Sequence, residues 1–92
     1  MKHAGSDTLN RLAPLLRRLR MLPGLVERKP GIFYVRSNAF LHFHEDPAGV
    51  FADVKVNGRS FERLPVQTAA EKSSLLAAVS NALARLQESK PR

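Results

Sequence analysis

The spacing of hydrophobic residues is helical in the first part of the chain. A stripe of leucines recurs there every three or four residues, made up of Leu9, Leu12, Leu15, Leu16 and Leu19. This spacing predicts an amphipathic helix over residues 7–22. Pro14 lies inside that segment, and proline is readily accommodated only in the first turn of a helix. We therefore expect the helix either to begin near residues 10–13 or to be kinked there.

From Gly31 onward the hydrophobic period becomes two, which is typical of strands. The alternating runs are residues 32–35, 39–44, 50–56 and, more weakly, 61–66, where Pro65 indicates an edge strand. Turn signals separate them at Ser37-Asn38, at residues 46–49 and at Asn57-Gly58. The middle of the chain therefore reads as an antiparallel meander.

A second helix is predicted over residues 68–88. Thr68 and Glu71 have the spacing of a capping box. Apolar residues then follow on one side of the helix: Leu75, Leu76, Val79, Ala82, Leu83 and Leu86. The fold class is therefore α+β, a three- to four-stranded meander sheet with an N-terminal and a C-terminal helix on one face. We expect one domain over residues 7–88, a disordered tail over 1–6 and a basic tail over 89–92.

The turns also predict which residues share a sheet face. With Ser37-Asn38 as a two-residue turn, Tyr34 opposes Leu41, and with a turn at 46–49, Phe43 opposes Ala52. The predicted core face holds Ile32, Tyr34, Leu41, Phe43, Val50, Ala52, Val54 and Val56. The predicted open face holds Phe33, Val35, Phe40, His42, His44, Phe51, Asp53 and Lys55. Because half of that open face is apolar, we expect a ligand or a partner to cover it, most simply a second copy in a homodimer.

The candidate chemistry lies on the same predicted face. His42 and His44 have strand spacing, and the register puts His42 opposite Asp53. Two imidazoles and a carboxylate suit Zn, Fe or Mn, or an acid–base pair in which Asp53 fixes the His42 tautomer. The simpler interpretation is a polar cross-strand pair that stabilises the sheet. A metal site usually needs a third or fourth ligand, and His3 is relevant only if the tail folds back.

The charge of the chain suggests a second function class. The net charge is +7, and most of the excess lies between Arg11 and Arg36. A basic surface attracts polyanions, so nucleic acid is a candidate partner; the bases involved are Arg11, Arg17, Arg18, Arg20, Arg28 and Lys29. The alternative is a solvated face that keeps a small protein in solution, since no aromatic residue is interleaved with the arginines of the helix.

The sequence lacks the residues that several kinds of site and reaction require. There is no cysteine, so disulfides and thiolate metal sites are excluded. No serine lies in a Gly-x-Ser-x-Gly elbow and no phosphate-binding loop is found, which argues against a nucleophilic enzyme and against a nucleotide cofactor. No signal peptide and no apolar run near the roughly 20 residues of a membrane span is seen, so we expect a cytoplasmic protein without a membrane partner.

The segment Asn38-Ala39-Phe40-Leu41-His42-Phe43-His44 resembles the Phe-x-His-x-His strand of a bacterial family often labelled "luciferase domain". The resemblance spans about residues 22–86 and implies an uncharacterised α+β module, not light emission, with Phe40, His42 and His44 as the matching positions. The turn at 45–49 is longer here, which leaves Asp53 without a clear counterpart. A more remote similarity, through Leu22-Pro23-Gly24, is to MmcQ/YjbR-like proteins, although their later tryptophan motif is missing.

Taken together, these features favour a binding or interaction module that acts through the open sheet face rather than an enzyme. Two alternatives stay open. One is nucleic-acid binding through the basic first helix. The other is a metal-dependent or acid–base enzyme at His42, His44 and Asp53.

Overall fold

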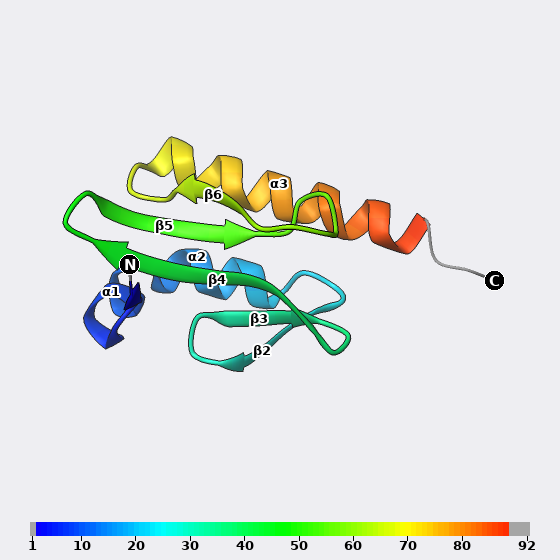
Figure 1. Cartoon of the computed structure of the whole chain (residues 1–92), viewed down its shortest axis with the longest axis horizontal. Coiled ribbons are helices and arrows are strands. Elements are labelled where there is room, and N and C mark those ends of the chain that lie inside the picture. Colours follow the sequence, from blue (N-terminus) through cyan, green and yellow to red (C-terminus); the bar gives the residue numbers. More distant parts are fainter. Residues whose placement is uncertain (1, 89–92) are drawn as a thin grey trace.

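The computed structural model describes residues 2–88 and has the predicted α+β architecture (Figure 1). Two short helices precede an antiparallel sheet, and one long helix follows it. The elements in chain order are β1 (Lys2–His3), α1 (Ser6–Arg11), α2 (Ala13–Arg20), β2 (Leu25–Lys29), β3 (Ile32–Val35), β4 (Asn38–Asp46), β5 (Gly49–Val54), β6 (Glu62–Pro65) and α3 (Ala69–Glu88). In this part of the chain, no helix combines the length and the apolar character that crossing a bilayer requires.

The predicted first helix is divided in two. Leu12 has φ −89° and ψ 4°, which ends α1 and begins α2, and Pro14 lies in the first turn of α2. Proline is tolerated there because the first helical N–H groups have no intrahelical acceptor. The leucine stripe still faces one way, since Leu12, Leu15, Leu16 and Leu19 are all buried.

The sheet has more strands than the sequence predicted. Strands β2 to β6 pair in chain order, and β1 pairs separately with β4. The missed strand β2 is mostly polar, with Leu25 buried and Val26 half exposed. It lacks the apolar alternation that would mark a strand, and pairing with β3 holds it in place.

The N-terminal segment is the second difference. Residues 1–6 were predicted to be disordered, but Lys2 pairs with Glu45 and His3 with His44. The Ala4 N–H donates to the Phe43 carbonyl at 3.0 Å, and the Gly5 N–H donates to Glu45 Oε2 at 3.3 Å. The physical reason is the length of β4: β3 pairs only with its first part, up to His42, so β1 can pair with the rest of that edge. The predicted tail at 89–92 lies outside the described residues.

The β3–β4 register differs from the prediction by two residues next to the turn and by one residue beyond it. The turn is at Arg36 and Ser37, with φ 58° at Arg36, so Val35 pairs with Asn38. A register shift between Phe33 and Tyr34 then brings Phe33 opposite Leu41. A slip of one residue exchanges the two faces of a strand.

This slip changes the predicted faces. Phe33 is fully buried in the core, and Phe40, in the irregular part of β4, is 3% exposed there. Val35 packs against the same core and is half-buried. The prediction that Phe33, Val35 and Phe40 lie on the open face is therefore wrong. Ile32 was predicted to face the core. It lies opposite His42 and therefore shares the face of that histidine instead.

The β4–β5 register is confirmed. His42 lies opposite Asp53, Phe43 opposite Ala52, and Leu41 opposite Val54. The turn that sets this register is stabilised as expected, because Asp46 Oδ1 accepts a hydrogen bond from the Ala48 N–H at 2.8 Å.

Helix α3 begins with the predicted capping box. The Glu71 N–H donates to Thr68 Oγ1 at 3.0 Å, and Glu71 Oε1 accepts from the Thr68 N–H at 3.0 Å. From there, the apolar side of α3 joins α2 and the inward side of the sheet in one core. Its buried residues are Leu12, Leu15, Leu16, Leu19, Leu25, Phe33, Phe40, Leu41, Phe43, Ala52, Val54, Val66, Leu75, Val79, Ala82 and Leu83.

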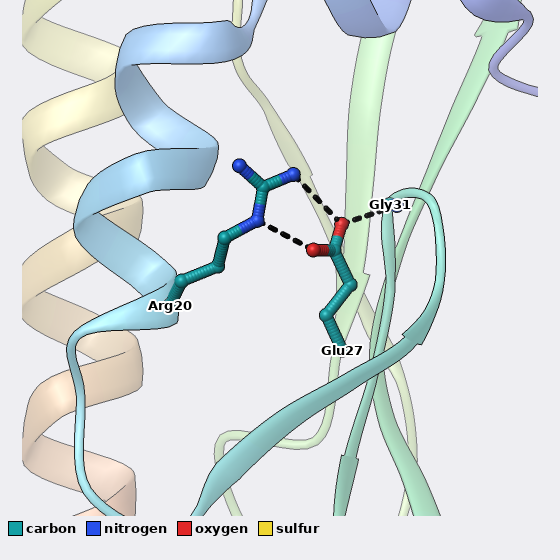
Figure 2. Close-up of polar contacts among 3 residues, drawn as sticks. All are labelled: Arg20, Glu27 and Gly31. Carbon is teal, nitrogen blue, oxygen red and sulfur yellow. Dashed lines mark hydrogen bonds and ion pairs between the residues drawn. The ribbon is translucent and has the colours of Figure 1, made fainter.

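An ion pair ties α2 to the β2–β3 hairpin (Figure 2). Arg20 contacts both carboxylate oxygens of Glu27, and Glu27 Oε2 also accepts from the Gly31 N–H at 2.9 Å. The hydrogen bond from Arg20 lowers the pKa of Glu27. Arg20, counted among the bases for nucleic acid, therefore has a structural partner.

Candidate metal centre

Three histidines meet on the sheet face that lies away from the core. His42 and His44 alternate with the buried Phe43 along β4, and β1 brings His3 directly opposite His44. The ring centroids of His3 and His44 are 4.8 Å apart, those of His42 and His44 4.7 Å, and those of His3 and His42 5.5 Å. One ring nitrogen from each histidine can be chosen so that all three lie within 4.8 Å of one another.

Two of these side chains carry buried nitrogens without a hydrogen-bond partner. His42 is half-buried and His44 is 9% exposed, and among the described residues neither Nδ1 atom finds a donor or acceptor. Buried polar atoms in folded proteins are nearly always partnered, because leaving one unpaired costs about 1–3 kcal/mol. A metal cation bound to such a nitrogen would supply the missing partner.

Asp53 lies beside His44 rather than His42. It is paired with His42 in the backbone register, but its Oδ2 is 3.0 Å from His44 Nε2. This contact is within ion-pair distance but lacks hydrogen-bond geometry, since His44 Nε2 has no hydrogen-bond partner among the described residues. The predicted acid–base pair, in which Asp53 fixes the His42 tautomer, is not formed. A carboxylate beside a histidine is a common partner of metal-binding histidines.

Arg63 holds Asp53 in its ionised form. Its Nε and Nη2 donate to the two carboxylate oxygens at 2.9 and 3.0 Å. This pairing lowers the pKa of Asp53 despite its burial. The ionised carboxylate of Asp53 therefore lies next to the histidines, with its charge offset by Arg63.

The surroundings of His42 favour its neutral form. Burial lowers its pKa, and the nearby His44 lowers it further, while Asp53 opposes both effects. A neutral imidazole is the form that ligates metal ions, so less proton release is needed for His42 to bind one.

The spacing of the nitrogens can be compared with that of a zinc site. Zinc–nitrogen bonds of about 2.0–2.1 Å in a tetrahedron separate neighbouring ligand atoms by roughly 3.4 Å. The histidine nitrogens lie within 4.8 Å, so coordination requires an approach of at most about 1.4 Å by any pair. His3 is exposed and on a two-residue strand, so its side chain can supply this movement.

An aromatic residue that the sequence analysis did not single out borders the cluster. Phe61 packs edge-on against His42, with 4.7 Å between ring centroids, and remains 41% exposed. The Lys55 ammonium lies 5.0 Å from the centre of the Phe61 ring. Phe61 was predicted to begin the fourth strand, and it lies directly before β6, in step with Arg63.

Some of the residues predicted to share the open face of the sheet do lie together in the structure. His42, His44 and Asp53 converge, and the half-buried Phe51 lies opposite His44. Phe33 and Phe40 need no partner to cover them, which removes the argument that led to the homodimer, although the homodimer itself stays a prediction. His3 was not among the predicted site residues, and the signal for its position was the unpaired edge of the second predicted strand.

The bases proposed for nucleic-acid binding do not form one surface. Arg17 and Arg18 are exposed on α2, which packs on the core side of the sheet, and Lys29 is exposed at the end of β2. Arg28 is stacked over Tyr34, 5.1 Å from the ring centre, and Tyr34 alternates with the buried Phe33. The positions of these bases thus extend over both sides of the sheet. Arg11 donates a hydrogen bond to Thr8 Oγ1 at 3.3 Å. Nucleic-acid binding stays a prediction.

A cavity of about 640 Å³ lies away from the histidines, between α1, the β4–β5 turn and the start of α3. Its lining mixes the cations Arg11 and Lys72 with the carboxylates Glu45 and Asp46. Because these charges offset one another, the cavity indicates no single class of ligand.

Comparison of the chain with models of protein families, with curated proteins and with solved structures finds no match. The resemblances to the "luciferase domain" and MmcQ/YjbR-like families therefore stay predictions. The argument for function depends on the site itself.

Proposed function

We propose that this protein is a metal-binding module in which His3, His42 and His44 hold one divalent transition-metal ion on the open face of the sheet. The observation that carries the proposal is the convergence of three imidazoles, from two segments distant in sequence, within 4.8 Å. Three protein ligands leave a fourth position of a tetrahedral ion open, as in metal sites that exchange a small ligand.

The competing interpretation is a set of histidines that merely pack on one another. Two observations weigh against it. The Nδ1 atoms of His42 and His44 are buried without hydrogen-bond partners among the described residues, a cost that packing alone does not offset. The ionised Asp53 stands 3.0 Å from His44, where it can support a histidine bound to a cation.

The three imidazole nitrogens indicate which class of metal ion the site would prefer. Imidazole ligands suit zinc, copper, iron and nickel, whereas calcium and magnesium prefer oxygen ligands. The chain has no cysteine, so the softer thiolate sites are excluded. We take Zn²⁺ as the reference ion, because it accepts a tetrahedral arrangement without redox chemistry.

The test is a calorimetric titration of the chelator-stripped protein with Zn²⁺. We expect one ion per chain, and a loss of about tenfold to a hundredfold in affinity when Asp53 is replaced in D53N. H42A and H44A should each lower the affinity for zinc strongly. The matched control is N38A, an exposed position on the same strand, which should bind zinc like the parent chain. Equal binding by H42A, H44A and N38A would refute the proposal.

A further inference from the structure

We infer that the open position of this metal takes a small oxyanion, a carboxylate or a phosphate group, which Lys55 and Arg63 attract to the rim of the site. The inference rests on the proposed function, because it names the ligand of the same metal. It is supported by the charges of Lys55 and Arg63 and by the aromatic ring of Phe61, all on the β5–β6 side of the histidines.

The charges around the site leave a positive excess. Asp53 and Arg63 are joined by two hydrogen bonds and offset each other, whereas Lys55 is added to the charge of the metal. Asp46 shares the face of His44 and interacts with Arg63, so it lowers this excess but leaves the charge of the metal in place. The other nearby carboxylates are turned away. Glu45 and Glu62 alternate with His44 and Arg63 along their strands, so they point to the opposite face. An anionic ligand is therefore favoured over a neutral or cationic one.

The two cations border the histidine cluster through Phe61 and Asp53. Phe61 packs on His42 at 4.7 Å, and the Lys55 ammonium lies 5.0 Å from the same Phe61 ring. Arg63 is bound to the carboxylate that contacts His44, and its side chain is 49% exposed. A guanidinium has five N–H donors, so binding Asp53 through two of them leaves capacity for a second acceptor.

Phe61 forms one side of this rim. Its ring forms an exposed apolar wall beside His42, on the side of Lys55. Such a wall would limit the access of water on the side of His42, which would strengthen the attraction between a bound anion and the cations. The ligand class is therefore a small oxyanion that binds the metal through oxygen and contacts the rim cations.

The experiment uses the Co²⁺-loaded full chain, whose visible absorption bands report on the ligands of the ion. Acetate and inorganic phosphate are added in separate titrations, which distinguishes a carboxylate from a phosphate preference. We expect at least one of them to change the bands saturably. K55Q should weaken that response about threefold to tenfold, as expected for removal of one nearby charge. K72Q removes a lysine on α3, away from the histidines, and should respond like the parent chain.

The outcomes separate the two proposals. Absence of cobalt binding would overturn both the metal site and its ligand. Cobalt binding with bands that neither anion changes would overturn the ligand alone. A saturable response that is equal in K55Q and K72Q would overturn the role of Lys55, and R63Q, checked for folding by circular dichroism, would then test Arg63 in the same way.

Discussion

His3 and His44 face each other across the β1–β4 pair, with 4.8 Å between their ring centroids. This pairing converts a two-histidine motif on one strand into a cluster that can hold a metal. It also means that the candidate site exists only while the N-terminal strand is docked on β4. Two backbone pairs and the bonds of Ala4 and Gly5 hold β1 in place, so a metal bound to His3 should add to its stability.

Zinc is therefore expected to protect the N-terminal strand from hydrogen exchange. The Ala4 amide donates to the Phe43 carbonyl, and it can exchange only when this contact opens. Hydrogen exchange read by mass spectrometry should slow for residues 2–5 when zinc is added. The matched variant H3A keeps the backbone pairing but should lose the zinc effect. Equal protection of H3A and the parent chain would contradict the link between β1 and the metal.

Phe33 is expected to be a core residue with a large effect on stability. It is fully buried, whereas Phe51 on the other face is half-buried. F33A should lower the free energy of unfolding by about 3–5 kcal/mol, and F51A should cost clearly less. Urea denaturation of both variants measures the difference. A cost for F33A no larger than that for F51A would contradict the burial of Phe33 in the core.

The ion pair of Arg20 and Glu27 should make stability depend on pH in the acid range. The pKa of Glu27 lies below its ordinary value of 4.5 in the folded protein. Its contribution is therefore fully present above the pKa of the unfolded chain and is lost as the pH falls through the folded pKa. E27Q should be less stable than the parent chain at neutral pH by about 1 kcal/mol, since Arg20 is partly exposed.

That difference should shrink when the pH is lowered below 4.5, because the parent chain then loses its charge on Glu27 and E27Q has none to lose. Thermal unfolding of both proteins across this pH range gives the measurement. A gap that stays constant with pH would mean that the carboxylate charge does not stabilise the hairpin.

Local sequence signals predicted the part of the fold that local chemistry controls. The capping box at Thr68, the Asp46 turn and the β4–β5 register are all confirmed, because each depends on residues close in sequence. Together they were enough to place His42 opposite Asp53. The β3–β4 register was wrong because Arg36 adopts a positive φ, which a non-glycine residue seldom does.

The remaining differences come from pairing between distant segments. Strand β2 has no apolar alternation of its own, and β1 has only two residues, so neither carries a pattern of period two. Both form because a neighbouring strand has an edge to pair with. Since β1 supplies His3, the third ligand could be recognised only when this pairing was known.

The central claim is that three imidazoles hold the metal, and X-ray absorption at the zinc edge of the zinc-loaded chain tests it most directly. The account predicts three imidazole nitrogens at about 2.0–2.1 Å from the ion, falling to two in H3A. A zinc ion with one imidazole or none, or a spectrum unchanged in H3A, would contradict it.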